Sequence, residues 1–195
     1  MTTRLLVGAA AALAVAAVTR AALASRPAPL ETVPAVDLAR YTGRWFEIAK
    51  LPNRFERSCA SDVQAEYTLN PDGTLGVVNS CRRADGRVVS RRATARVVDE
   101  ATRARLSVTF FWPFSGDYWI LALGPEEGPG PYEYALVGEP KRRFLWVLAR
   151  ERELPREVAE RLLAQAAAQG FDVSKVTWMP QRAPAADATR RSKAE

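Results

Sequence analysis

The sequence contains no histidine, and this limits the chemistry that its side chains could perform. Without imidazole, Ser-His-Asp and Cys-His catalysis, histidine-ligated haem and the usual zinc sites are excluded. If the protein were an enzyme, Glu47, Glu66 or Tyr134 would have to act as the base. The sequence therefore predicts no metal site and no cofactor, and it favours a binding protein over an enzyme.

The first 24 residues have the order of a secretory signal peptide. A basic residue at Arg4 precedes an apolar run over residues 5–18, and the small-residue pattern of residues 22–24 predicts cleavage before Ser25. An uncleaved anchor is the alternative, although the apolar run is short for a membrane span and Arg20 interrupts its end. No cysteine lies near the predicted cut, so nothing there could carry a lipoprotein's lipid.

The two cysteines, Cys59 and Cys81, gain meaning from this predicted export. An oxidising compartment favours a disulfide over free thiols, so we expect a Cys59–Cys81 bond. Two buried thiols are the alternative.

The net charge is +6, but basic and acidic residues are mixed throughout and no nucleic-acid-binding motif occurs. The basic excess indicates only a bias toward anionic ligands or membrane surfaces.

Short apolar runs alternate with clusters of Gly, Pro, Asp and Asn from Trp45 to Arg150. Regular short strands bounded by turn residues are typical of a β-sandwich or a β-barrel. The clearest turn is Asn70-Pro71-Asp72-Gly73, because proline fixes its own φ and glycine accepts a positive one. The predicted strands occupy residues 44–50, 63–69, 74–80, 88–98, 104–111, 117–123, 132–138 and 143–150.

The periodicity then becomes helical between Pro155 and Gly170. One apolar stripe is formed by Val158, Ala159, Leu162, Leu163 and Ala166. A short last strand is expected at residues 174–179.

One helix cannot cover both faces of an eight-stranded sheet. We therefore predict an all-β fold, an eight-stranded up-and-down antiparallel barrel with the helix packed outside. Such a barrel can hold one small ligand. The predicted domain spans residues 35–182, after a proline-rich lead-in at 25–34 and before a disordered tail at 183–195.

With these strands placed, the chain resembles the lipocalins. Gly43-Arg44-Trp45 is similar to the family's G-x-W signature, Asp117-Tyr118 at the start of the sixth strand resembles its second motif, and Arg150 resembles its third. The resemblance implies that Gly43, Trp45, Asp117, Tyr118 and Arg150 are structural, with the arginine packed over the tryptophan at the closed base. The segments RFERSC, YTLNPDG, SVTFFWPFSGDYWILAL and GFDVSKVTW are most similar to the bacterial outer-membrane lipocalins and apolipoprotein D.

Up-and-down topology places the loops at residues 51–62, 81–87, 112–116 and 139–143 at the open mouth. Cys59 and Cys81 then fall at the same end of adjacent strands, which suits disulfide geometry. The bond would close a loop of about twenty residues, worth about 3 kcal/mol in the chain-entropy model. It would hold the first loop over the cavity.

The mouth loops are basic and aromatic. The basic residues are Arg82, Arg83 and Arg87 in one loop and Lys141, Arg142 and Arg143 in another, opposed by Asp85 and Glu139. Between these loops lies an aromatic rim of Phe111, Trp112 and Phe114. Such an entrance fits an amphiphile whose tail is inside and whose anionic head meets Arg142 and Arg143. A solvated basic surface is the alternative reading, and the turns at the base hold Asp72, Asp99, Glu126 and Glu127 instead.

Strand alternation suggests Trp119, Tyr134 and Trp146 for the cavity wall, although a bulge would move any of them to the other face. The leading hypothesis is binding, storage or transport of a small apolar or amphiphilic ligand, such as a fatty acid or lysophospholipid. We expect an exported, periplasmic or envelope-associated protein, monomeric or weakly dimeric, with possible membrane-surface contact and no nucleic-acid partner. The alternatives are a lipid-modifying isomerase or cyclase and a structural envelope protein.

Overall fold

The computed structural model describes residues 28–125 and 128–182. Strands dominate this part of the chain, accompanied by two α-helices and one short 3₁₀ helix, η1 (Val173–Lys175). The α-helices are α2 (Leu38–Tyr41) and α3 (Arg156–Ala168). The strands are β1 (Gly43–Lys50), β2 (Ser61–Leu69), β3 (Leu75–Arg82), β4 (Val88–Val97), β5 (Arg105–Phe111), β6 (Phe114–Gly124), β7 (Tyr134–Gly138), β8 (Leu145–Ala149) and β9 (Thr177–Trp178).

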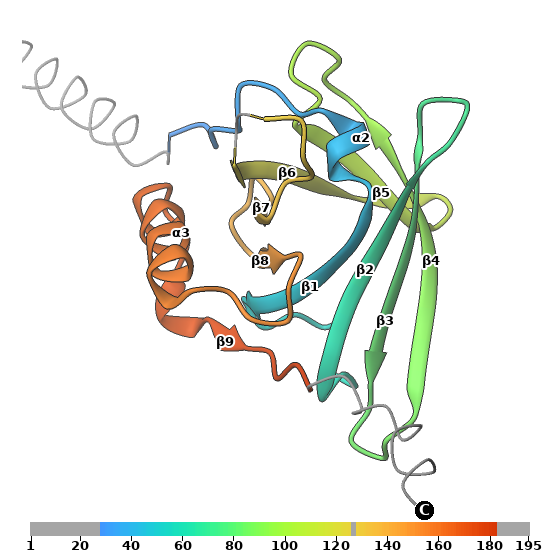
Figure 1. Cartoon of the computed structure of the whole chain (residues 1–195), viewed down its shortest axis with the longest axis vertical. Helices are drawn as coiled ribbons and strands as arrows, with labels where there is room; N and C mark the ends of the chain where they lie inside the picture. Colours follow the sequence, from blue (N-terminus) through green and yellow to red (C-terminus); the bar gives the residue numbers. More distant parts are fainter. Residues whose placement is uncertain (1–27, 126–127, 183–195) are drawn as a thin grey trace, which may run out of the picture.

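The strands form one antiparallel sheet in which each strand from β2 to β8 pairs with the next along the chain (Figure 1). β1 closes the ring, because it pairs with β8 between Phe46 and Lys50 and with β2 between Gly43 and Phe46. The predicted eight-stranded barrel is therefore confirmed. β9 is an additional strand that pairs with Ala49 and Lys50 of β1.

The C-terminal segment completes the barrel wall near the mouth, where β1 and β2 no longer pair with each other. Gln181 Nε2 donates to the carbonyl oxygens of Glu47 and Val63 at 2.8 and 3.0 Å, and so it bridges the two strands. Nearby, the backbone N–H of Asp62 donates to the carbonyl of Pro180 at 2.9 Å. The last strand is shorter than the predicted 174–179, but the segment that contains it seals the ring.

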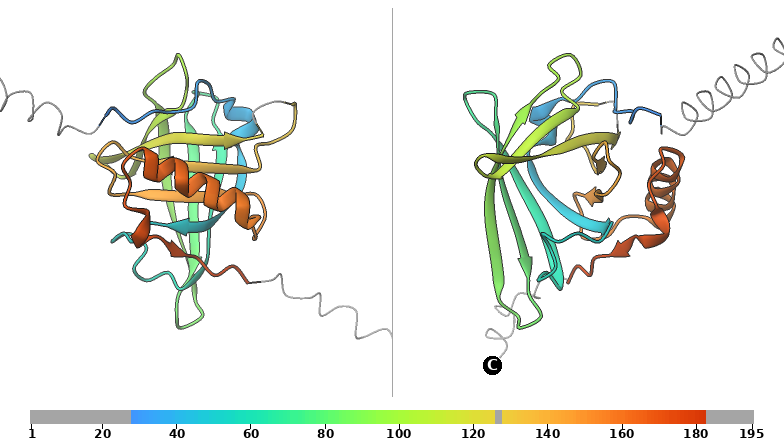
Figure 2. Two further views of the ribbon diagram at one scale, coloured as in Figure 1. Left: turned by 90° about the vertical axis from the view of Figure 1, so that its left-hand side faces the viewer. Right: turned by 180° about the vertical axis from the view of Figure 1, so that it is seen from behind.

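α3 covers the outer face of the sheet, as Figure 2 shows. Its buried residues are Ala159, Leu162 and Ala166, and Val158 and Leu163 are partly buried against the same cluster, which confirms the predicted stripe. The helix packs on outward-facing residues of the sheet that include Phe46, Leu136 and Val147. Gly170 follows the helix with φ of +88°, a conformation that glycine adopts without steric cost.

Two boundaries differ from the prediction, one at the start of β6 and one at the start of the domain. β6 begins at Phe114 rather than at residue 117, so Asp117 lies within the strand and the β5–β6 connection is reduced to residues 112–113. The lead-in is also part of the packed structure, because Leu30 and Val33 are buried and the N–H of Val33 donates to the Ile120 carbonyl at 3.0 Å. The predicted signal peptide and tail lie outside the described residues.

The base of the barrel is closed by Trp45, whose side chain is fully buried. Its indole N–H donates to the carbonyl of Tyr41 in α2 at 2.8 Å. The guanidinium carbon of Arg150 lies 4.0 Å from the centroid of a Trp45 ring, which confirms the expected stacking. Gly43 has φ of +90°, and a Cβ atom there would lie 3.3 Å from Arg150 Nη1. Glycine at this position thus admits both the backbone turn and the arginine.

Arg150 also joins three segments of the base by hydrogen bonds. Its guanidinium donates to the carbonyls of Tyr132, Arg44 and Arg40 at 2.8, 2.9 and 2.8 Å. These carbonyls belong to the β6–β7 connection, to β1 and to α2. One side chain after β8 therefore fixes the chain where it enters the barrel.

Tyr118, from the second predicted motif, belongs to the same base. Its hydroxyl lies 2.7 Å from that of Tyr41 and accepts a hydrogen bond from Tyr67 at 2.8 Å. Burial raises the pKa of all three tyrosines, that of Tyr67 to about 12, so the phenols stay neutral. The motif residue is structural, as the resemblance implied.

We expect Arg150→Lys to lower the free energy of unfolding by about 1–3 kcal/mol, because an ammonium cannot donate to three separated carbonyls while stacking on Trp45. Chemical denaturation measures the loss. Arg156→Lys is the matched control, since Arg156 is exposed and pairs only with Glu160, four residues away. An Arg150→Lys protein as stable as the control would contradict the structural role.

Candidate functional site

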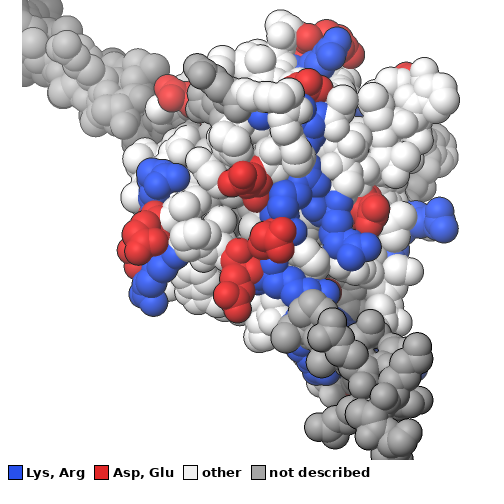
Figure 3. All heavy atoms as spheres, in the orientation of Figure 1, with Lys and Arg blue, Asp and Glu red and all other residues white. Residues whose placement is uncertain are grey.

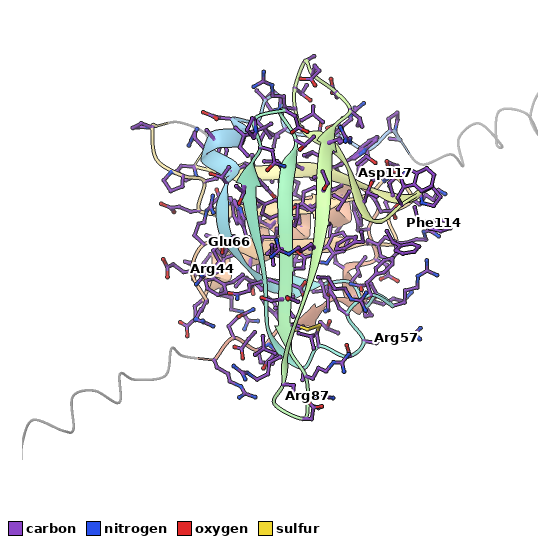
Figure 4. All side chains as sticks on the ribbon, turned by 90° about the vertical axis from the view of Figure 1, so that its right-hand side faces the viewer. Arg44, Arg57, Glu66, Arg87, Phe114 and Asp117 are labelled. Atoms are coloured by element: carbon purple, nitrogen blue, oxygen red, sulfur yellow. A yellow bond between two sulfur atoms is a disulfide. The ribbon has the colours of Figure 1, made fainter. Side chains whose placement is uncertain are left out.

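The open mouth lies at the end of the barrel away from Trp45, where four connections gather. They are residues 51–60 between β1 and β2, called here the lid loop, and residues 83–87, 112–113 and 139–144. Arg57, Arg87 and Phe114 come from three of these connections or their borders, and Figure 4 shows them on one side of the barrel, with Arg44 and Glu66 toward the other. The predicted grouping of these loops at one end is confirmed.

The lid loop is bonded covalently to the barrel. A disulfide joins Cys59 in the loop to Cys81 on β3, which confirms the predicted pairing over two free thiols. The two residues are 22 positions apart, a loop length for which cross-linking is worth about 3 kcal/mol. Next to the disulfide, the N–H of Ala60 donates to the Arg82 carbonyl at 2.8 Å. This end of the lid loop is therefore fixed to the rim.

The barrel interior is filled at the base and more open toward the mouth. Five apolar side chains that pack against the inner cluster keep partial solvent exposure, and two of them, Val108 and Trp146, lie between the base and the mouth loops; the other three are Ala65, Val97 and Tyr118. Gly116 pairs with Val108 and so shares its inner face, and a Cβ atom at Gly116 would meet no atom within 4 Å. The inner face of the sheet is therefore uncovered at Gly116, on the mouth side of β6.

Trp146 lies on the inner wall, where alternation predicted it, because it packs with the cluster that contains Leu148. Its indole N–H donates to Glu56 Oε1 of the lid loop at 3.2 Å. Phe144 stacks on it with 6.0 Å between ring centroids, and Phe55 of the lid loop lies 5.4 Å from Phe144. These rings form a continuous aromatic surface from the wall to the lid loop.

Beside Trp146, three charged side chains form what we call the Glu47–Lys50–Glu56 cluster. Lys50 pairs across the sheet with Trp146 and Glu47 with Leu148, so both strand residues face the interior. The Lys50 ammonium lies 3.1 Å from Glu47 Oε1 and contacts Glu56 Oε2. Glu47 is 3% and Lys50 7% exposed. Two carboxyl groups therefore share one buried cation, and the contact holds the free side of the lid loop.

Burial controls the protonation of this cluster. It raises the pKa of Glu47 from 4.5 to about 8, an effect that the neighbouring Glu56 charge increases and Lys50 opposes. For Lys50, burial lowers the pKa but the two carboxylates raise it further, and the net direction is upward. At neutral pH Lys50 is charged, whereas Glu47 is largely protonated.

Only one of the three acid–base candidates faces the interior. Glu66 is on the outer face, 3.5 Å from exposed Arg44, and Tyr134 lies outside under α3. Glu47 and Glu56 do form a pair of inward acids, the arrangement that acid–base chemistry would use. Both contact the same ammonium, however, and Glu56 also accepts from Trp146, so their contacts are those of an anchor for the lid loop.

The structure corrects two of the three predicted wall residues. Trp119 and Tyr134 pack against the cluster beneath α3, on the outer face of the barrel. Arg105 stacks on Trp119 at 4.5 Å, and the Tyr134 ring occupies the space that a Cβ at Gly124 would need. Alternation failed here because α3 covers these strands, so both of their faces are apolar, and because a bulge shifts the register between Ile120 and Ala122.

The aromatic rim is present at the tip of the β5–β6 hairpin. Phe111, Trp112 and Phe114 are 75%, 83% and 72% exposed. Phe111 and Phe114 pair with each other as the last and first residues of their strands rather than lying in a loop. Phe110, which the sequence analysis did not select, is also exposed and extends this apolar tip.

Arg142 does not contribute to the mouth. It has φ of +57°, and its guanidinium donates to the carbonyls of Gln169, Pro140 and Ala28, so it secures the C-terminal end of α3 and the lead-in. Its assignment as a residue for the ligand's head is therefore wrong. Arg143 is exposed, with its guanidinium 5.6 Å from the Phe144 ring centroid and its Nε 4.0 Å from Glu139 Oε1.

The other basic loop is also more neutralised than its sequence indicates. Arg82 pairs with Asp62 at 3.0 Å and Arg87 with Asp85 at 2.8 Å. Asp62 has two further cations within 4.0 Å, Arg152 and Arg182. On the face in Figure 3, basic and acidic residues likewise lie side by side. Of the six basic residues predicted at the mouth, Arg82, Arg87 and Arg143 thus have carboxylate partners and Arg142 is bound to carbonyls, which leaves Arg83 and Lys141.

Sequence reasoning missed the residues that connect the lid loop to the wall. Lys50 and Glu56 were not selected, nor was Phe55 beside them. A signal existed, because Glu47 and Lys50 interrupt the apolar residues of β1, which is buried on both faces from Trp45 onward. Charged residues in such a strand require partners, but Glu56 as the partner depends on how the lid loop folds back.

No helix in the described part of the chain is long and apolar enough to span a membrane.

Comparison with known proteins places these features in a family. A model described as "Lipocalin-like domain" matches residues 36–181. "Outer membrane lipoprotein Blc" of Escherichia coli K12 is 41% identical over 161 residues, covering 80% of this chain and 88% of that protein. Apolipoprotein D of Macaca fascicularis is 36% identical, covering 72% and 75%. The structure of insecticyanin from the tobacco hornworm Manduca sexta superposes with a TM-score of 0.60 at 21% identity, covering 76% and 84%.

The raised pKa of Glu47 predicts a pH dependence of stability with a definite sign. A carboxyl whose folded pKa exceeds its unfolded value stabilises the fold below the unfolded pKa, and that contribution is lost as the pH rises through about 8. Glu47→Gln mimics the protonated form. Relative to this variant, the wild type should lose about 1 kcal/mol or more of unfolding free energy between pH 5 and pH 9. Parallel pH profiles in denaturant titrations would show that Glu47 is not the titrating group.

Proposed function

The chain belongs to the lipocalin family, and from this premise we propose that it binds a small apolar or amphiphilic molecule inside its barrel. The observation that carries the proposal is the inner space that opens toward the mouth above a sealed base. Partly exposed apolar side chains line this space, and Gly116 borders it without a neighbour. Apolar pockets with a few polar groups are the usual form of ligand sites.

The ligand class we favour is a single-chain lipid, such as a fatty acid or lysophospholipid. Its apolar chain would pack in the interior against Val108 and Trp146, since burial of methylene groups supplies about 0.8 kcal/mol each. Its polar head would remain near the mouth. Storage or transport of such a lipid, rather than its chemical conversion, is supported by the engagement of both inner carboxyls with Lys50.

We place this activity in the bacterial cell envelope. Support comes from the signal-like first 24 residues of the sequence and from the relative whose name describes an outer membrane lipoprotein. The chain has no cysteine near the predicted cut, so a lipid anchor like that of a lipoprotein is not part of the proposal. We propose an exported protein that acts in the periplasm or at a membrane surface.

Contact with membranes would use the exposed tip of the β5–β6 hairpin. Aromatic side chains favour the boundary between water and acyl chains, and Trp112 is the most exposed large apolar residue described. The tip borders the mouth, so docking there would bring the opening of the barrel to the lipid surface. Transfer of a lipid would then need only a short path through water.

Trp146→Ala should weaken ligand binding about tenfold or more, because this indole is part of the inner wall and also positions Glu56. Displacement of a fluorescent fatty acid measures the affinity. Trp119→Ala is the matched control, a tryptophan of the same barrel whose ring lies on the outer face under α3. Equal loss of affinity in the two variants, or no binding by the wild type, would refute the interior site.

The hairpin tip predicts a separate effect on membranes. Replacing Phe111, Trp112 and Phe114 together by serine should reduce binding to phospholipid vesicles in co-sedimentation about tenfold, while fatty-acid affinity in solution changes little. Trp178→Ser is the control, because Trp178 is 53% exposed but lies on β9. Vesicle binding that survives the triple substitution would show that another surface makes the contact.

A further inference from the structure

The inner face of β4 carries a cation that none of the sites above uses. Arg91 pairs across the sheet with Asn79 of β3, between the pairs Ala93–Val77 and Val89–Cys81. Ala93 and Val77 belong to the inner cluster. Since side chains alternate along a strand, Arg91 shares their face and points to the interior on the mouth side.

Arg91 is also uncommitted. Its side chain makes no hydrogen bond, ion pair or ring contact with any residue that the structure describes, and it is exposed although it lies on the inner face. The other cation on the inner face of the described strands, Lys50, is buried between two carboxyls. Arg142 and Arg82 are held by carbonyls or by Asp62. Arg91 is therefore the inward cation that remains available.

The cross-strand partner of Arg91 is polar and incompletely bonded. Asn79 Oδ1 is buried and has no hydrogen-bond partner among the described residues. A buried amide oxygen without a partner is costly unless water or a ligand supplies a donor. Two adjacent polar groups on an otherwise apolar wall thus lack the partners that a ligand's head could provide.

The distribution of charge inside the barrel indicates which wall would receive an anionic head. The Glu47–Lys50–Glu56 cluster is on β1 and the lid loop, whereas Arg91 is on β4, three strands away by the order β1–β2–β3–β4. The cluster carries two carboxyls for one ammonium, so Lys50 is already paired and offers an arriving anion no free positive charge. The β4 wall presents an unpaired guanidinium instead.

Resting on the proposed lipid-binding function, we propose that Arg91, supported by Asn79, binds the anionic head of the ligand inside the mouth. The ligand is then a single-chain amphiphile ending in a carboxylate or a phosphate, with its head on the β4 wall and its chain toward the base. A guanidinium suits either oxyanion because it can donate two parallel hydrogen bonds. This site takes the place that the sequence analysis assigned to Arg142.

The test uses the full chain and four ligands that share one saturated twelve-carbon chain. They are dodecanoic acid, dodecyl phosphate, dodecanol and dodecylamine, each competing at pH 7 with a neutral fluorescent probe, N-phenyl-1-naphthylamine. We expect the acid or the phosphate to bind about tenfold more tightly than the alcohol, as a charge-assisted contact implies. Which of the two anions binds more tightly distinguishes a fatty-acid head from a phospholipid head.

Substitutions then assign the effect to Arg91. Arg91→Gln should bring the anions to the affinity of dodecanol, and Arg91→Glu should make dodecylamine the tightest ligand. Arg92→Gln is the matched control, since Arg92 is the next residue of β4, exposed and on the outer face opposite Val78. Melting temperatures of all variants confirm that they are folded.

The outcomes separate this inference from the function on which it rests. If the wild type binds the alcohol as tightly as both anions, or if Arg91→Gln keeps the preference for anions, the assignment of Arg91 fails while lipid binding stands. If neither the probe nor any of the four ligands binds, the proposed function fails and the inference fails with it.

Discussion

Closure of the sheet at β1 is the constraint on which the rest of the structure depends. β1 pairs with β2 only from Gly43 to Phe46, and beyond that point the two strands separate. Gln181 then bridges their carbonyls from the C-terminal segment, and β9 pairs with β1 beside it. Without the pairings of β1 the sheet would have two open edges and no interior. The C-terminal contacts extend this closure toward the mouth, so residues from both ends of the described chain form the wall.

The same closure explains why a tryptophan and an arginine suffice to seal the base. Trp45 stands where β1 still pairs with β2, so its ring faces the interior at the narrow end. Arg150 covers that ring and binds the carbonyls of the segments that converge there. Burial, stacking and hydrogen bonds are concentrated in the Trp45–Arg150 pair. The mouth half of the barrel takes no part in sealing the base. The seal of the base thus lies at the end of the barrel opposite the ligand's entrance.

Alternation in the sequence indicates which residues face the interior where the two faces of a strand differ in polarity. In β4, Ala93 and Ala95 alternate with Arg92 and Arg96, so one face reads as interior and the other as solvent. Under α3 both faces are apolar, and alternation could not tell Trp119 or Tyr134 from an inner residue. The barrel, the helix, the disulfide and the stacking of Arg150 on Trp45 were accessible because each depends on spacing or on a motif. The wall residues depend on registers that bulges change.

Charge was harder to predict, because the number of charges in a loop does not reveal their partners. Asp62 lies near Arg82, Arg152 and Arg182, which come from three distant parts of the sequence. Arg142 turns away from the mouth to the end of α3 for a similar reason, since the exposed carbonyls of a helix end accept hydrogen bonds. A cation in a loop is therefore available to a ligand only if the fold supplies no closer acceptor. Arg91, within a strand, meets that condition.

The lid loop is held at the mouth by two kinds of contact, one covalent and one polar and reversible. The C-terminal end of the loop is held by a disulfide, which does not dissociate under oxidising conditions, and its middle is held by Glu56, whose side chain is 19% exposed. Because water can reach Glu56, its contacts with Lys50 and Trp146 are weaker than the same contacts would be in a dry interior. A loop fixed at Cys59 and held reversibly at Glu56 can yield on one side without leaving the barrel.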